Sequence, residues 1–142
     1  GVQTCALPIS TMYAMVRHAG FLLASAALLM AAAVALGAIG SHALASALTP
    51  DRLAIWHTAV EYHFYNALGL LGTGLLCERH PSSRLAMTAG MFVLAGIGMF
   101  SGSLYVYAIS GIKWLTMLAP LGGTSMIVGW ILLCIAVTRI RA

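Results

Sequence analysis

Charged side chains are scarce in this chain. Among its 142 residues there are seven Lys or Arg and three Asp or Glu, so that 7% of the residues are charged and 61% are hydrophobic. A soluble domain has roughly 25% charged residues and covers its surface with them. Because the apolar residues also form long uninterrupted runs, the composition excludes a soluble enzyme, a secreted mini-protein and a disordered tail. The sequence therefore predicts an integral membrane protein.

Four stretches are predicted to cross the membrane as helices, namely residues 18–40, 58–77, 85–109 and 114–138. The first, third and fourth carry no charge over 20 or more residues, as a hydrocarbon core about 30 Å thick requires. The second stretch is less regular. Its charge-free part would be only about 24 Å long, so this span must begin near residue 58 and include Glu61. The predicted fold class is all-α, an integral membrane four-helix bundle with short loops.

The chain is expected to form one membrane domain over residues 12–142. Residues 1–10 resemble one reading frame of a sequencing-library adapter, so residues 1–11 are interpreted as a non-native leader, with the native start at Met12 or Met15. The first span resembles a signal peptide, but a signal peptide has an apolar region of about 7–15 residues. We therefore expect this longer helix to be retained.

The distribution of basic residues predicts the orientation. Four spans place both termini on one side of the membrane. That side would hold Arg17, Arg79, Arg84, Arg139 and Arg141, against Arg52 and Lys113 on the other. The positive-inside rule then puts both termini in the cytoplasm. Since the basic residues are scattered singly and form no stripe, no nucleic-acid partner is expected.

Polar side chains gather on one half of the second span. On a helical wheel this half carries His57, Glu61, Tyr62, Tyr65, Asn66, Gly69, Gly72 and Thr73. We expect the polar half to face the bundle, because polar groups in membranes usually face the protein interior. The other half, with Leu70 and Leu71, should then face lipid. His63 falls on that lipid half, near the headgroups.

Glu61 is the only acidic residue that this assignment places inside the membrane. An unpaired carboxylate there costs at least a few kcal/mol, so a partner is expected. The candidate functional cluster is His42, His57, Glu61, Tyr65, Asn66 and Lys113, with Tyr105 and Tyr107 as further hydrogen-bond donors. A functional role for Glu61 and a purely structural tether of the helix ends both remain open. Because the Glu-x-x-His pair of di-iron bundles is absent, no metal site or other cofactor is expected.

Small residues predict where helices pack and where one of them breaks. Gly37 and the pair Gly98 and Gly102 have the spacing that lets helices approach closely. In the fourth span Pro120 lies beside Gly122 and Gly123. Proline removes a backbone hydrogen bond, so a kink or a short unwound turn is expected there.

Several motifs follow one another in the order of a known family. They are Ala35–His42 (ALGAIGSH), Glu61-Tyr62, Phe100–Tyr105 (FSGSLY), Pro120–Gly123 (PLGG) and Gly129-Trp130. With these motifs the chain resembles the domain-of-unknown-function family 423, small bacterial membrane proteins related to eukaryotic transmembrane protein 256. Two positions depart from the family, Ser41 where alanine is frequent and Ala119 where threonine is usual. The resemblance implies a four-helix inner-membrane protein and supplies no activity.

Three functions are compatible with these features. The leading hypothesis is a non-enzymatic membrane protein that acts through contacts with lipid, with other membrane proteins or with further copies of itself. It rests on the small-residue packing and the very short loops. The alternative is a small proton-coupled or solute transporter that acts as an oligomer. It would be built around Glu61, His57, Tyr65, Asn66 and the Pro120–Gly123 break. The third is a metal-dependent membrane enzyme. The sequence names neither a ligand nor a partner.

Overall fold

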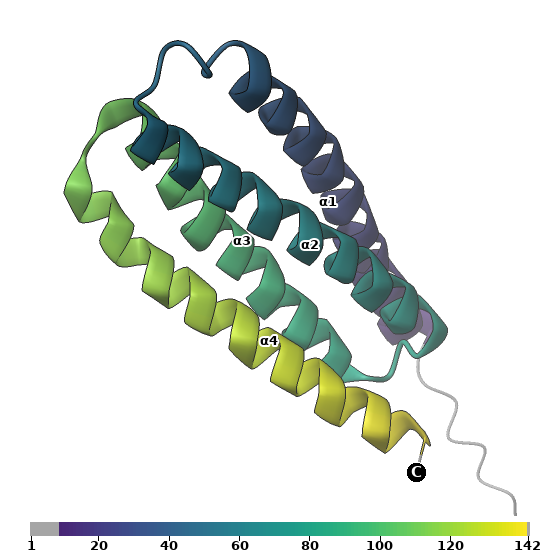
Figure 1. Ribbon diagram of the computed structural model, residues 1–142. Coiled ribbons are helices and arrows are strands. Elements are labelled where there is room, and N and C mark those ends of the chain that lie inside the picture. Colours follow the sequence, from purple (N-terminus) through teal and green to yellow (C-terminus); the bar gives the residue numbers. More distant parts are fainter. Residues whose placement is uncertain (1–8, 142) are drawn as a thin grey trace, which may run out of the picture.

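The chain folds into four long helices with short connections (Figure 1). The computed structural model describes residues 9–141, and the side chains of residues 19–140. The helices are α1 (Ile9–His42), α2 (Pro50–Arg79), α3 (Arg84–Ser110) and α4 (Leu118–Arg141), and a 3-10 helix, η1 (Lys113–Met117), precedes α4. The described part contains no strand, which confirms the all-α class. Of the expected leader, residues 1–8 lie outside the described residues.

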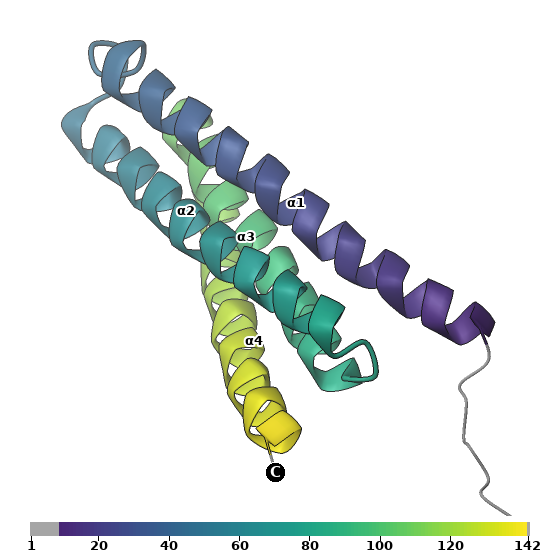
Figure 2. The same cartoon turned by 90° about the vertical axis from the view of Figure 1, so that its right-hand side faces the viewer.

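Each helix packs mainly against its neighbours in the sequence. α1 contacts α2, α2 contacts α3, and α3 contacts α4. The beginning of α1, the α2–α3 connection and the end of α4 lie at one end of the bundle, and the α1–α2 connection and η1 lie at the other (Figures 1 and 2). α2 therefore lies between α1 and α3 and has one long side that faces neither of them.

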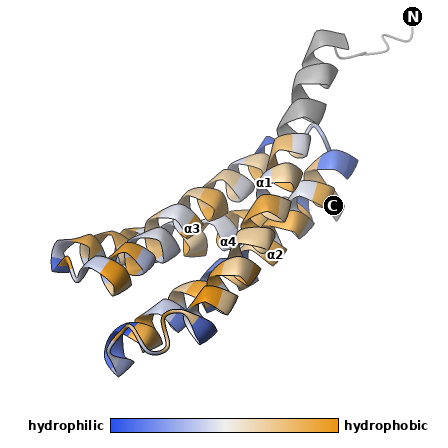
Figure 3. Ribbon diagram, turned by 90° about the horizontal axis from the view of Figure 1, so that it is seen from above, coloured by the Kyte–Doolittle hydropathy of each residue, from blue (hydrophilic) through white to orange (hydrophobic). Residues whose placement is uncertain are grey.

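Three segments are long and apolar enough to cross a membrane, Ala19–His42, Arg84–Ser110 and Lys113–Ile140. They coincide closely with three of the four predicted spans. α2 does not reach the same hydropathy, because polar residues interrupt it. Colouring by hydropathy shows hydrophilic residues gathered at the loops and helix ends and apolar residues along the helices (Figure 3).

Local signals set the helix ends. α2 begins at Pro50, where proline's missing N–H needs no partner. The Thr49 hydroxyl at its N-cap makes no capping hydrogen bond. Ser83 caps α3 by accepting a hydrogen bond from the Ala86 amide. α3 ends at Gly111, whose φ of 73° is the left-handed conformation that glycine adopts without strain.

The buried core is built largely from small side chains. Among the largest fully buried side chains are Leu22, Leu70 and Val93. The core cluster consists of Ala19, Leu22, Ala26, Leu70, Cys77, Ala86, Val93, Ile97, Met126 and Ala136. All four helices contribute to it, and small residues allow their backbones to come close, as is usual in membranes.

The closest helix approach is between α3 and α4. A Cβ atom added at Gly122 would meet the backbone nitrogen of Phe100, and one added at Gly129 would lie 3.0 Å from the carbonyl oxygen of Ala89. Gly96 faces Gly122 in the same way. A Cβ atom added at Gly96 would lie 2.9 Å from the carbonyl oxygen of Gly122. Backbone atoms cannot move aside as a flexible side chain does, so glycine is required at these positions.

The fourth span changes from the 3-10 helix η1 to the α-helix α4 between Met117 and Leu118, just before the break expected at Pro120. α4 runs without interruption from Leu118 to Arg141. Pro120 lies in its first turn, where the backbone N–H groups have no partner within the helix and proline is tolerated. Gly122 is buried against α3, and a Cβ at Gly123 would make ordinary contact with the Phe100 ring at 3.8 Å. The glycines therefore serve helix packing.

Two of the three glycines expected to pack helices together make no close contact within the described residues. A Cβ atom added at Gly98 or Gly102 would meet no atom within 4 Å, so neither glycine packs against another helix of this chain. At Gly37 an added Cβ would make ordinary contact with Val60 at 3.5 Å. Glycine spacing on its own did not distinguish the contact face of a helix from its outer face.

Candidate functional site: the two faces of helix α2

Helix α2 has two opposite stripes, each with residues spaced alternately by three and four positions. The buried stripe consists of Trp56, Ala59, His63, Asn66, Leu70, Thr73 and Cys77. The exposed stripe consists of Ala54, Thr58, Glu61, Tyr65, Leu68, Gly72 and Leu75. This spacing is the one that lets a helix lie along a neighbouring helix. The buried stripe packs against the rest of the described chain, and every residue of the exposed stripe is accessible from outside it.

Asn66 on the buried stripe connects α2 to α4. Its Oδ1 accepts a hydrogen bond of 2.9 Å from Trp130 Nε1, and its Nδ2 donates one of 2.9 Å to the Tyr62 carbonyl oxygen. The Trp130 ring lies against Gly69, where a Cβ atom would collide with it. The amide is therefore bonded through both of its polar atoms, and Gly69 makes room for the ring.

A second polar group on the buried stripe connects α2 to α3 and α1. His63 is only 5% exposed, and its Nδ1 lies 3.2 Å from the Tyr105 hydroxyl. The Tyr105 ring packs against Trp56, with their centroids 4.7 Å apart. Trp56 in turn donates a hydrogen bond of 3.0 Å from Nε1 to the Leu36 carbonyl oxygen of α1. The Gly40 backbone lies directly against the Trp56 ring.

The placement of His63 corrects the sequence prediction, which put this residue on the lipid side. Leu70, expected toward lipid, is fully buried as well. Two buried side-chain atoms of the described residues have no hydrogen-bond partner in the protein, His63 Nε2 and Ser101 Oγ. Ser101 lies one helical turn from Tyr105 on α3, so the polar part of the core lies between α2 and α3.

Glu61 lies on the exposed stripe, which also corrects the prediction that its half of the helix faces the bundle. Its Oε1 accepts a hydrogen bond of 3.1 Å from the Tyr65 hydroxyl, one turn further along α2. The Tyr65 side chain is itself 61% exposed. Glu61 is exposed as well.

The remaining members of the predicted cluster do not gather around Glu61. His42, His57 and Lys113 are exposed, at the end of α1, near the start of α2 and in η1 respectively. Asn66 bonds to Trp130 instead. Among the described side chains, those of residues 19–140, no three His, Cys, Asp or Glu lie close enough to hold a metal ion. The structure thus divides the predicted cluster into an outward pair, Glu61 and Tyr65, and an inward amide.

Sequence reasoning missed the partners of the buried polar groups. Trp130 appeared only as part of a family motif, and Tyr105 only as part of another motif and as a possible donor to Glu61. The regular spacing from Trp56 to Cys77 was the available signal. This spacing did not show which side of α2 is buried, because the exposed stripe has the same spacing.

The comparison with known proteins gives a family. The sequence model described as "Protein of unknown function (DUF423)" matches residues 36–123. This stretch includes the whole of α2 and α3 and the glycines at the start of α4. The chain belongs to this family.

Similar proteins are found in several bacteria. UPF0382 membrane protein YwdK of Bacillus subtilis is 40% identical over 107 residues, which is 75% of this chain and 87% of that protein. UPF0382 membrane protein SSP2132 of Staphylococcus saprophyticus is 37% identical over 76% of this chain and 88% of its own length. UPF0382 inner membrane protein YgdD of Escherichia coli is 32% identical over 76% of this chain and 82% of its own length.

These relatives are named as membrane proteins, and the chain has three helices apolar enough to cross a bilayer. The predicted family and the predicted membrane location are therefore confirmed. No solved structure matches the chain significantly.

Proposed function

We propose that the protein is a four-span inner-membrane protein, with α2 as the fourth span. α2 packs between α1 and α3, both of which are long and apolar enough to cross the bilayer. It has 30 residues, and at ~1.5 Å per residue it is about as long as they are. Much of its polarity is internal, since Asn66 and His63 bond to side chains of α4 and α3. A helix held in this position crosses the membrane together with its neighbours.

The proposed orientation has both termini in the cytoplasm. The α2–α3 connection, flanked by Arg79 and Arg84, lies at the same end of the bundle as Arg139 near the end of α4. Arg52 and Lys113 lie at the opposite end. The positive-inside rule favours the Arg-rich end as the cytoplasmic one. A reporter that functions only in the cytoplasm, fused after Ala142, should be active; activity of an exported reporter at that position would contradict the orientation.

The proposed function is non-enzymatic: the exposed stripe of α2 binds a transmembrane helix of another membrane protein. The observation that carries this proposal is the outward position of Glu61. With α2 in the membrane, the carboxylate lies near the outer boundary of the hydrocarbon core and has one hydrogen-bond partner, Tyr65. Intramembrane ionisable groups normally face protein or water, because facing lipid costs several kcal/mol. A partner helix would supply the missing protein environment.

The side chains of the exposed stripe indicate what kind of helix could bind to it. Ala54, Thr58 and Gly72 are small and allow a second helix to approach closely. Opposite Glu61 the partner should carry a hydrogen-bond donor, either a basic or a hydroxyl or amide side chain. A second copy of this chain fits less well, because parallel α2 helices related by a twofold axis would bring their Glu61 carboxylates together, and like charges at close range repel. The proposed partner is therefore a different protein.

The transporter alternative is less well supported by the geometry. It requires Glu61 to face a path through the protein and α4 to break near Pro120. Instead, Glu61 lies on the outside of the four helices, and α4 is continuous through Gly122 and Gly123. The two features meant to form the path do not lie together in one chain.

The test is purification of the tagged full chain from native membranes in mild detergent. Wild type and Glu61→Ala are compared with Glu78→Ala, which removes an exposed carboxylate from the end of the same helix. The proposal expects one membrane protein in constant ratio with wild type and Glu78→Ala. It expects about three- to twentyfold less with Glu61→Ala, because hydrogen bonds between membrane helices contribute about 0.6–1.7 kcal/mol.

Three results of this purification would contradict the proposal. One is recovery of lipid without a protein partner. Another is equal recovery of the same partner with Glu61→Ala. The third is a partner that proves to be a second copy of the chain, which would show that the stripe serves self-association.

A further inference from the structure

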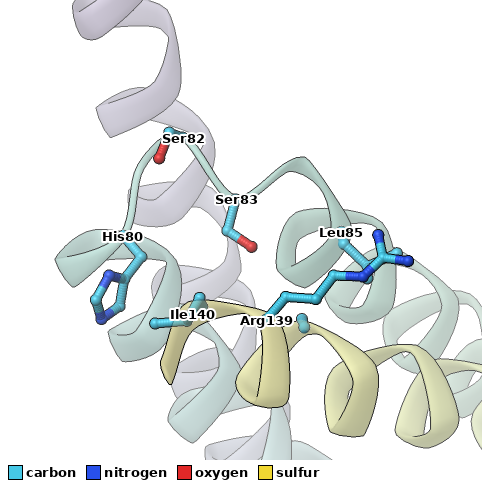
Figure 4. A pocket seen from close by; sticks show the side chains of 7 residues that line it. His80, Ser82, Ser83, Leu85, Arg139 and Ile140 are labelled. Atoms are coloured by element: carbon cyan, nitrogen blue, oxygen red, sulfur yellow. The ribbon is translucent and has the colours of Figure 1, made fainter. Parts of the chain in front are cut away.

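A pocket of about 350 Å³ lies at the end of the bundle that holds the end of α4. The α2–α3 connection forms one wall with His80, Ser82 and Ser83, and α4 forms another with Arg139 and Ile140 (Figure 4). Leu85, at the start of α3, contributes an apolar surface. The volume is within the range of small-molecule sites, about 300–1,000 Å³.

The polar groups of this pocket suit an anion. Arg139 brings a guanidinium group with several N–H donors, and Ser82 and Ser83 bring hydroxyls from the facing segment. No carboxylate lines the pocket. Arginine binds phosphate oxygens with paired, charge-assisted hydrogen bonds, and neighbouring hydroxyls complete such sites. The combination favours a phosphate group over a neutral ligand.

Charged residues outside the pocket also favour the binding of an anion. Arg79 and Arg84 are exposed at the two helix ends that flank the connection, and Glu78 is the acidic residue nearby in the sequence. Together with Arg139 they make this end of the described bundle net positive. Basic groups between helices on the cytoplasmic side of membrane proteins bind anionic lipid headgroups.

An apolar groove of about 530 Å³ lies further along the same pair of helices. α3 lines it with Met87, Met91, Phe92 and Met99, and α4 closes it with Ser125. Thr88, which also lines the groove, is three residues beyond Leu85 of the basic pocket, and residues three apart are neighbours on a helix surface. The groove thus begins within one turn of the basic pocket and extends along α3 toward the middle of the helix.

We propose that the basic pocket binds the phosphate of an anionic phospholipid, whose acyl chain follows this groove. The phosphate chemistry comes from Arg139 and the serine hydroxyls, and the neighbouring groove favours a lipid over free phosphate as its source. The site is at the opposite end of the bundle from Glu61, so it is independent of the partner-binding stripe. It would anchor one lipid between α3 and α4 at the cytoplasmic surface.

The test measures lipid retained by the purified full chain with native mass spectrometry. The protein is equilibrated in mixed micelles with equal amounts of phosphatidylglycerol and phosphatidylcholine. Wild type should retain phosphatidylglycerol preferentially. Arg139→Gln should lower its retention about tenfold, as loss of a charge-assisted hydrogen bond implies. Ser82→Ala removes one neutral hydrogen bond and should lower it about threefold.

Arg79→Gln is the matched control, because Arg79 is exposed at the same end but does not line the pocket. It should change retention less than Arg139→Gln does. Equal losses in these two variants would show attraction by surface charge alone and overturn the proposal. Equal retention of both lipids by wild type would also overturn it. A second arm adds excess inorganic phosphate without lipid: binding that depends on Arg139 would identify free phosphate as the ligand and refute the lipid assignment.

Discussion

Trp130 Nε1 donates a hydrogen bond of 2.9 Å to Asn66 Oδ1, across 64 positions of the sequence. The bond joins α4 directly to α2, which otherwise contact one another little and are both held by α3. Since the Asn66 amide also donates to the Tyr62 carbonyl oxygen, a polar group inside a membrane protein is bonded on both sides. This pair explains how a helix as polar as α2 is kept among apolar ones.

The Asn66–Trp130 bond is expected to contribute measurably to stability. A double-mutant cycle with Asn66→Ala and Trp130→Phe should give a coupling free energy of about 0.6–1.7 kcal/mol, the range for hydrogen bonds between membrane helices. The measurement is reversible unfolding of the full chain in detergent micelles. Pairing Asn66→Ala with Trp114→Phe, which alters an exposed tryptophan, should give no coupling. Additive effects of Asn66→Ala and Trp130→Phe would contradict this assignment.

Gly69 is expected to tolerate no larger residue. A side chain there would collide with the Trp130 ring, so Gly69→Val should lower the free energy of unfolding by about 1–3 kcal/mol, as overpacking does. Gly72→Val is the control on the same helix, because an added Cβ there meets nothing within 4 Å. Both variants change helix propensity alike, so the difference between their melting temperatures measures the contact. Equal melting temperatures would refute the contact.

The α3–α4 contact predicts that two glycines differ in their response to alanine. Gly122→Ala places a Cβ against the backbone of Phe100 and should destabilise the protein by about 1–3 kcal/mol. Gly102→Ala enters open space and should stabilise it by up to about 1 kcal/mol through helix propensity. Thermal unfolding in one detergent checks both. If Gly102→Ala were the more damaging change, Gly102 would be the contact residue, as the sequence motif suggested.

The His63–Tyr105 bond predicts an effect for the loss of one hydroxyl. Tyr105→Phe keeps the ring against Trp56 but leaves His63 Nδ1 without its partner, which should lower the free energy of unfolding by about 1 kcal/mol. Tyr107→Phe, two positions along the same helix, serves as the control. An unchanged stability of Tyr105→Phe would mean that the bond contributes nothing in the membrane-like environment.

The sequence predicted the helices well because long apolar runs determine them directly. The three apolar spans coincide with the segment of α1 from Ala19, with α3 and with the segment from Lys113 to Ile140. The positions of charges are local properties. They do not depend on which side of a helix meets which neighbour.

The rotation of α2 was not predicted, for a physical reason. The wheel assigned the inward side by the position of Glu61, on the assumption that a charge faces the protein interior. In the structure, Trp56, Ala59 and Asn66 define the inward side, and Glu61 faces away from the chain. Both stripes have the same spacing, so only the packing partners, Trp130 and Tyr105 among them, decide which is buried.

For the same reason, the sequence did not predict which glycines of α3 contact another helix. Gly98 and Gly102 have the spacing of a packing motif but lie on the open side of α3, and Gly96 and Gly122 make the contact. The spacing of glycines shows that another helix can approach closely, but it does not show which helix does so. Gly98, Gly102 and the exposed stripe of α2 therefore all lie on the outer surface of the described chain.

The most direct test of the central claim is site-specific photo-cross-linking in native membranes. A photoreactive residue is placed at Tyr65 on the α2 stripe, or at Val34 on α1 or Ile127 on α4, which have nearly the same exposure of 61%, 63% and 62%. The account predicts a cross-link to one other membrane protein from position 65, lost when Glu61→Ala is added, and no such product from positions 34 and 127. Equal cross-linking from all three positions, or none from position 65, would contradict it.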